Sequence, residues 1–166
     1  TTAVPPWPGH TCQDLVAERG RRALVEAAAR VPRIRRVRDL LADELDARFA
    51  AVAPRCLYGV IHGELGPDHV MVDDAGAPAL IDIEGTMVFD VEWEHAFLEL
   101  RFGPLYHRLH TVPLDEARMR LYRLVHHLSL VAGPLLLIEG DFSQSERMRE
   151  IAAGNAERVL SSLSEA

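Results

Sequence analysis

Residues 62–85 read HGELGPDHVMVDDAGAPALIDIEG. Within this stretch, the turn formers Asp73-Asp74-Ala75-Gly76 separate two short apolar runs. Apolar runs on either side of an Asp- and Gly-containing turn are typical of a β-hairpin. The sequence therefore predicts that residues 69–72 pair in antiparallel fashion with residues 79–82.

Three side chains on this stretch, Glu64, His69 and Asp82, are of the kinds that bind cations. Glu64 lies on the loop before the hairpin, and His69 and Asp82 lie at the two ends of its strands. Because the first and last residues of a tight hairpin are close in space, we expect His69 to face Asp82. We expect all three to converge on a divalent cation, with Glu64 placed to orient or deprotonate a nucleophile.

Helical periodicity surrounds the hairpin on both sides. Apolar spacing and helix-ending prolines predict two long helices before it and at least three after it. The predicted helices cover residues 11–31, 34–52, 91–102 and 114–131, and a last one starts at Ser143 or Ser145. Gly133-Pro134 is expected to end the fourth. The predicted fold class is mainly α (α+β), with helices around a small antiparallel hairpin, and a parallel wound sheet is not expected.

Composition excludes several classes of function. The chain has 166 residues, a net charge of −7 and a pI near 5.6, which argues against nonspecific nucleic-acid binding. The apolar run at residues 135–138 is far too short to span a bilayer, so no membrane partner is expected. Two cysteines cannot form a disulfide framework, which favours a cytoplasmic location. All 18 basic residues are arginine, so the chain has no lysine to contact phosphates.

Residues 57–102 resemble the catalytic region of the aminoglycoside phosphotransferase family, small-molecule kinases with a protein-kinase-like fold. The family pattern is H-G-D-x-x-x-x-N followed by a strand that ends in I-D, and His62, Gly63 and Asp82 match it. The resemblance implies that Glu64 is the catalytic base. It implies that His69 and Asp82 bind Mg²⁺ and the nucleotide, ATP or GTP.

Further along, the segment D-V-E-W-E-H-A, residues 90–96, resembles the family's G-D-P-x-x-D-L-A segment. Glu94 stands at its second acidic position, and the resemblance implies that Glu94 and His62 support the catalytic loop. Asp90 and Glu92 are otherwise expected to belong to a solvated charge run.

The resemblance also implies a domain organisation. Residues 1–10 correspond to an interlobe linker, and residues 11–166 correspond to the C-terminal, substrate-binding lobe of a kinase-like enzyme. No glycine-rich phosphate loop is found, so we expect a missing N-terminal nucleotide lobe as a partner and a chain that is inactive alone. The implied substrate is a small molecule with a hydroxyl group, such as an aminoglycoside.

Two changes from the family pattern leave a second function open. Glu64 replaces an Asp, and His69 replaces an Asn whose amide oxygen suits Mg²⁺ better than an imidazole does. These changes are compatible with a catalytically degenerate kinase-like module used for binding or regulation. A Glu64 that points into solvent or pairs with Arg101 would favour that module. A third possibility is a helical interaction domain in which the motif is a coincidence.

Overall fold

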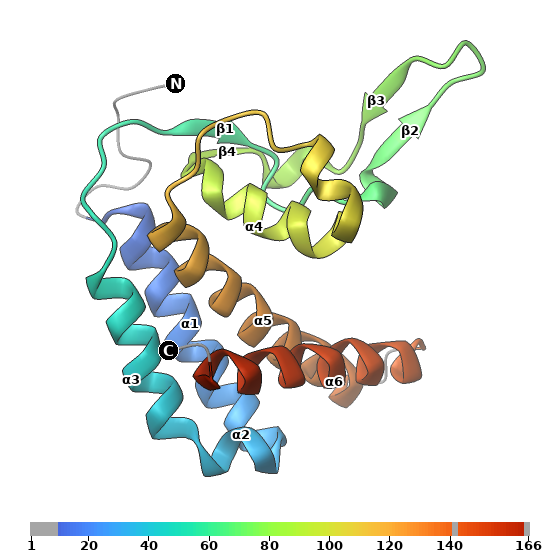
Figure 1. Cartoon of the computed structure of the whole chain (residues 1–166). Coiled ribbons are helices and arrows are strands. Elements are labelled where there is room, and N and C mark those ends of the chain that lie inside the picture. Colours follow the sequence, from blue (N-terminus) through green and yellow to red (C-terminus); the bar gives the residue numbers. More distant parts are fainter. Residues whose placement is uncertain (1–9, 141–142, 165–166) are drawn as a thin grey trace. The chain divides into compact units, whose positions relative to one another are not determined.

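The computed structural model describes residues 10–140 and 143–164. Most of the predicted linker, residues 1–10, therefore lies outside the described residues. The helices and strands are α1 (Cys12–Arg30), α2 (Pro32–Arg36), α3 (Arg38–Ala50), β1 (Gly59–Ile61), β2 (Val70–Val72), β3 (Pro78–Leu80), β4 (Met87–Phe89), α4 (Val91–Phe102), α5 (Glu116–Glu139) and α6 (Ser145–Ser161) (Figure 1). The mainly helical class and the antiparallel strands match the prediction.

The chain divides into two units. We call residues 1–12 and 54–119 the mixed unit, and residues 13–53 and 120–166 the helical unit. The predicted lobe, residues 11–166, spans both. The mixed unit contains every strand of the described residues and the whole stretch whose sequence carries the candidate chemistry.

The helical unit is built around a fully buried apolar stripe on α5. Its members Leu121, Leu124, Leu128 and Val131 are each at most 1% exposed, as their helical spacing predicts. Gly20 of α1 allows close packing, because a Cβ there would lie 2.8 Å from Val125 Cγ2.

Helix α5 continues through Gly133 and Pro134, so the prediction that this dipeptide ends it is wrong. An interior proline removes one helical hydrogen bond, a cost that packing on either side can offset. Pro134 itself is buried, and the last turn is held by Arg30, whose guanidinium donates to Glu139 at 2.8 and 3.0 Å. By length and composition, α5 is also long and apolar enough to cross a membrane, a property that the core helices of soluble proteins share. Half of its apolar 18-residue stretch is buried within the protein.

The mixed unit contains two separate antiparallel pairs of strands. Strands β2 and β3 form the predicted hairpin, with Val70 opposite Leu80 and Val72 opposite Pro78. Its turn is held by Asp73, whose carboxylate accepts the backbone N–H groups of Ala75 and Ala77 at 3.0 and 2.8 Å. Such side-chain acceptance is the reason Asp initiates turns.

The second pair joins β1 to β4, with Gly59 opposite Phe89 and Ile61 opposite Met87. Strand β4 was not predicted, because three residues directly before a helix carry almost no periodic signal. The β1–β4 pair contacts α4 and thereby brings the loop after β1 next to the first turn of that helix.

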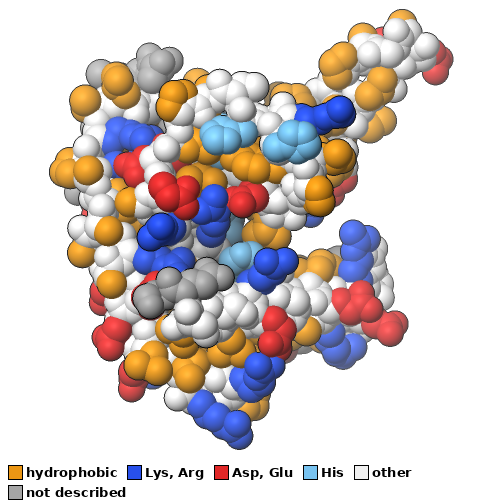
Figure 2. Space-filling view, in the orientation of Figure 1, with side chains coloured by type: hydrophobic (Ala, Val, Ile, Leu, Met, Phe, Trp, Pro, Cys, Tyr) orange, Lys and Arg blue, Asp and Glu red, His pale blue; other side chains and the backbone are white. Residues whose placement is uncertain are grey.

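The hairpin β2–β3 extends away from the rest of the mixed unit (Figure 1). Hydrophobic side chains lie on the surface of this hairpin (Figure 2). Met71 is 55% exposed, Val72 63% and Leu80 54%. An isolated two-stranded hairpin is only marginally stable in water, and exposed apolar side chains in a cluster are typical of a surface that contacts something else.

Candidate functional site at the base of the hairpin

The loop after β1 is held in place by Glu94. The carboxylate of this buried residue, on the first turn of α4, accepts the backbone N–H of Gly63 at 2.6 Å and that of Leu65 at 2.9 Å. Trp93 adds a hydrogen bond from its indole N–H to the carbonyl of Gly63, at 3.2 Å. Gly63 has φ of +99°, a conformation that glycine adopts without strain. Glu94 therefore fixes the backbone on both sides of Glu64.

His62 links this loop to the strand that returns from the hairpin. The residue is 8% exposed, and its ring Nε2 lies 2.9 Å from the carbonyl oxygen of Ile81. The backbone N–H of Ile81 in turn donates to the carbonyl of His69 at 3.0 Å. These contacts make His62 a brace between the loop and the residue that precedes Asp82.

His69 and Asp82 come together as the hairpin prediction requires. His69 Nε2 lies 3.5 Å from Asp82 Oδ2, and the His69 ring stacks on His62 with centroids 5.5 Å apart. Asp82 is the only non-glycine residue with positive φ in the described part of the chain, at φ 59° and ψ 44°. The left-handed backbone follows β3 and precedes a 3₁₀ turn, Ile83–Gly85.

Glu64 does not complete a three-residue centre with them. The described residues contain no group of three or more His, Cys, Asp or Glu side chains able to hold a metal ion. Glu64 is exposed, and no described residue forms a hydrogen bond or ion pair with its carboxylate. The expectation of three-way convergence is therefore wrong. The physical reason is that the N–H groups on both sides of Glu64 point to Glu94, while the Glu64 side chain remains at the surface.

Arg101 binds Asp68, not Glu64. The hydrogen bond from Arg101 holds the pKa of Asp68 below its ordinary value. Arg101 thus holds the short 3₁₀ turn, Pro67–His69, that leads into β2.

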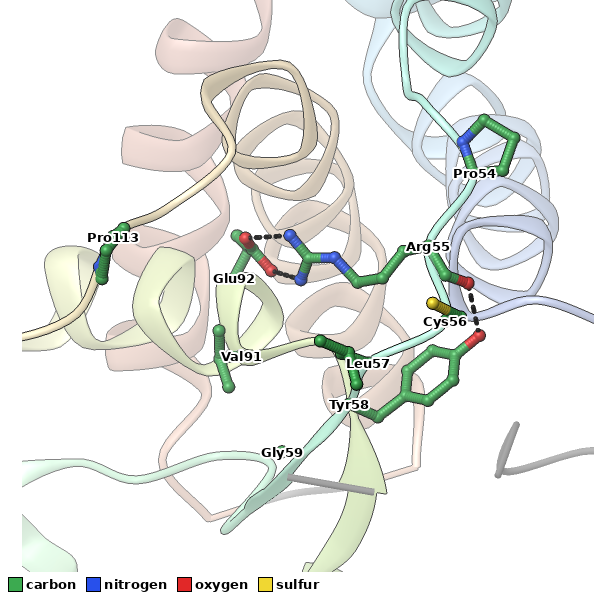
Figure 3. A pocket seen from close by; sticks show the side chains of 9 residues that line it. All are labelled: Pro54, Arg55, Cys56, Leu57, Tyr58, Gly59, Val91, Glu92 and Pro113. Carbon is green, nitrogen blue, oxygen red and sulfur yellow. Dashed lines mark hydrogen bonds and ion pairs between the residues drawn. The ribbon is translucent and has the colours of Figure 1, made fainter. Parts of the chain in front are cut away.

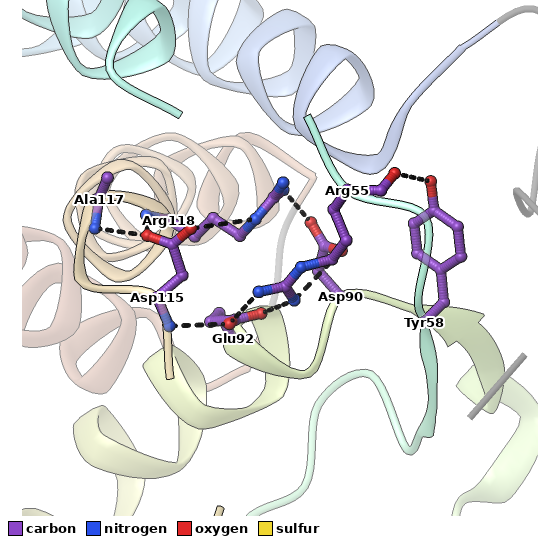
Figure 4. A network of polar contacts seen from close by, with 7 residues as sticks. All are labelled: Arg55, Tyr58, Asp90, Glu92, Asp115, Ala117 and Arg118. Atoms are coloured by element: carbon purple, nitrogen blue, oxygen red, sulfur yellow. Dashed lines mark hydrogen bonds and ion pairs between the residues drawn. The ribbon is translucent and has the colours of Figure 1, made fainter. Parts of the chain in front are cut away.

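A buried ionic network lies beneath the start of α4 (Figure 4). Arg55 forms a bidentate pair with Glu92 at 2.5 and 2.7 Å, and Arg118 donates to Asp90 at 2.6 Å. Asp90 and Glu92 are fully buried, so the prediction that they are solvated is wrong. Sequence alone did not show which distant arginines would pair with them, although buried charges require such partners.

The network also connects to the start of α5. Glu92 accepts the backbone N–H of Asp115 at 3.0 Å, and Asp115 caps the helix by accepting the N–H of Ala117 at 2.9 Å. Burial by itself would raise the pKa of Glu92, but the hydrogen bonds from Arg55 and from the Asp115 backbone hold that pKa below its ordinary value. Glu92 therefore stays ionised at neutral pH.

A pocket of about 440 Å³ opens beside this network (Figure 3). It is lined by residues 54–59, Val91, Glu92 and Pro113. None of the residues predicted to act in catalysis lines it. Sequence reasoning found no function for Cys56, which lies at this pocket and is exposed.

The two cysteines are expected to differ sharply in reactivity. Cys56 is exposed, whereas Cys12 is 1% exposed and burial raises the pKa of its thiol to about 12. Because the thiolate is the reactive form, Ellman's reagent should label one thiol quickly in the folded protein and both in urea. Cys56→Ser should abolish the fast labelling of the folded protein. A fast phase that survives this substitution would contradict the assignment.

Comparisons of the chain with family models, curated proteins and solved structures return no match.

Proposed function

We propose that this chain is the substrate-binding and catalytic-loop lobe of a cytoplasmic, ATP-dependent phosphotransferase that acts on a hydroxyl group of a small molecule. The observation that carries the proposal is the approach of His69 to Asp82 at 3.5 Å, beside a loop held by Glu94. The two residues are separated in sequence by a complete hairpin, and they meet where the resemblance to aminoglycoside phosphotransferases expects a metal-nucleotide site.

The donor set is compatible with a magnesium-nucleotide complex. Mg²⁺ at nucleotide sites takes only one or two protein ligands, because phosphate oxygens and water supply the others. Asp82 would supply a carboxylate oxygen and His69 an imidazole nitrogen. The bound cation would neutralise phosphate charge during transfer.

Glu64 is assigned the role of base or orienting group for the acceptor hydroxyl. Its exposed carboxylate is accessible to a molecule in solution, and its backbone is fixed by Glu94 on both sides. A fixed backbone holds the Glu64 carboxylate in one region, and an accessible carboxylate can contact and orient the hydroxyl group of a small acceptor.

Charge and surface support two further parts of the proposal. No arginine lies between Arg55 and Arg101, and the exposed carboxylates of Glu64, Asp82 and Glu84 lie in that segment, which favours a cationic acceptor such as an aminoglycoside. The exposed apolar residues of the β2–β3 hairpin would be covered by a nucleotide-binding lobe that supplies the phosphate-contacting lysine this chain lacks.

A second candidate is a catalytically degenerate kinase-like module that binds a ligand or regulates a partner. The observation that favours it is the exposure of Glu64 together with the lack of any contact from the described residues to its carboxylate. In that case the loop after β1 keeps its kinase-like backbone, and Glu64 catalyses no reaction.

The test separates nucleotide binding from transfer in the full gene product. Asp82→Asn should weaken binding of Mg·ATP about tenfold and lower transfer with it, because a charged ligand is lost. Glu64→Gln should leave Mg·ATP binding near wild type and lower transfer at least about tenfold. Equilibrium dialysis with radiolabelled ATP measures binding, and label transfer to an aminoglycoside panel measures the reaction.

Asp74→Asn, a matched change at the exposed hairpin tip, serves as the control and should alter neither quantity. Mg·ATP binding without any transfer, unaffected by Glu64→Gln, would favour the degenerate module. Indifference of Mg·ATP binding to Asp82→Asn would contradict the phosphotransferase proposal and would also favour the module.

A further inference from the structure

The His69–Asp82 pair is open on one side. The His69 side chain is 19% exposed and the Asp82 side chain 52% exposed, so a solute reaches the pair from the carboxylate side. The separation of 3.5 Å between Nε2 and Oδ2 is longer than a normal N–H···O hydrogen bond. The two groups are therefore near one another without being joined by a close hydrogen bond.

That separation suits two ligands of one cation. Nitrogen and oxygen ligands at about 2.1 Å from a divalent ion lie roughly 3.0 to 3.4 Å apart, depending on the coordination angle. Only a small movement would bring both atoms onto one ion. No third His, Cys, Asp or Glu joins them among the described residues, so the other ligands would be water or phosphate oxygens.

The orientation of the His69 imidazole is fixed by protein contacts without any bound ligand. The His69 ring stacks on His62 with an interplanar angle of 16°, and His62 is fixed by the Ile81 carbonyl. His69 Nδ1 is buried without a hydrogen-bond partner in the described part of the chain, so no protein contact there selects one tautomer. Nε2 is the ring nitrogen that faces Asp82, and it would offer its lone pair to a cation in the tautomer that carries the proton on Nδ1.

We propose that His69 makes this a mixed nitrogen–oxygen site that binds Mn²⁺ in preference to Mg²⁺. Imidazole nitrogen is a good ligand for first-row transition ions and a poor one for Mg²⁺, which prefers oxygen. The inference deepens the proposed function by naming the metal of the same site. The pair itself is present whether or not the chain transfers phosphate.

The test uses the metal alone. Mn²⁺ should broaden the NMR resonances of His69 in the full chain, and bound Mn²⁺ should show electron spin-echo modulation from an imidazole nitrogen. His69→Asn should weaken Mn²⁺ binding by at least about tenfold, because substitution even of residues that only hydrogen-bond to metal ligands typically costs that much affinity. The same substitution should not weaken Mg²⁺ binding. Mn²⁺ affinity is measured from the EPR signal of the free ion, and Mg²⁺ by competition.

His107→Asn is the matched control, because His107 is exposed and its Nδ1 contacts only the Pro104 carbonyl among the described residues. It should leave Mn²⁺ binding unchanged. Equal affinities of the wild-type chain for Mn²⁺ and Mg²⁺, or bound Mn²⁺ without nitrogen modulation, would overturn the inference. The modulation needs no variant, so misfolding of His69→Asn would not decide the result. The metal measurement and the transfer measurement are independent of one another. Loss of the Mn²⁺ preference would leave Mg²⁺-dependent transfer possible, and absence of transfer would leave the Mn²⁺ preference possible.

Discussion

Arg118→Met is expected to lower the free energy of unfolding by about 3 to 5 kcal/mol, the largest stability effect that the structure predicts. Arg118 is 1% exposed and donates to the fully buried carboxylate of Asp90 at 2.6 Å. Methionine fills a similar volume but removes this charged donor, and the Arg55 guanidinium lies farther from the Asp90 carboxylate, at 3.6 Å. The midpoint of urea denaturation measures the loss.

The control is Arg21→Met, which removes a similar ion pair from the surface. Arg21 and Asp46 have side chains 50% and 60% exposed, so the loss should stay below about 1 kcal/mol. The double variant Arg118→Met, Asp90→Leu should be less destabilised than the sum of the two single variants, because the buried carboxylate that loses its close donor is removed as well. A loss below about 1 kcal/mol for Arg118→Met would show that the buried pair does not stabilise the mixed unit.

Glu94→Ala is expected to release the loop that carries Glu64. Alanine leaves the N–H groups of Gly63 and Leu65 without their acceptor, at a cost of about 2 to 4 kcal/mol for two partly buried donors. Hydrogen exchange at these two amides should become fast while amides of α4 remain protected. Unlike Arg118→Met, this change therefore acts mainly on one loop.

Glu84→Ala removes an exposed carboxylate from the 3₁₀ turn after Asp82 and should leave exchange at Gly63 and Leu65 unchanged. If Glu94→Ala also left these amides protected, Glu94 would not be what holds the loop. Under the proposed function, Glu94→Ala should lower phosphate transfer more than Glu84→Ala does.

The hairpin and most helices could be predicted because their signals are local. Asp73 and Gly76 mark a turn by their own chemistry, and Gly76 takes the φ of +82° that such a turn needs. Helix α4 begins and ends at the predicted residues, Val91 and Phe102. The meeting of His69 and Asp82 follows from the hairpin geometry itself.

The parts that were missed depend on distant residues. Whether Asp90 is solvated or buried depends on Arg118, and the continuation of α5 past Pro134 depends on contacts such as that between Arg30 and Glu139. Neither partner is visible in the local pattern. The position of Glu64 was missed for the same reason, since the contacts that fix its loop come from α4.

The left-handed backbone of Asp82 would, under the proposed function, connect the thermal stability of the protein to ligand binding at a single position. A non-glycine residue in this conformation costs roughly 1 kcal/mol, and glycine would remove that cost. A selection for thermal stability alone would therefore favour glycine at position 82, and glycine has no carboxylate to offer a cation. Asparagine tolerates the same backbone and lacks the charge. Under the proposed function, variants stabilised at this position would therefore lose cation binding while the hairpin and its turn stay intact.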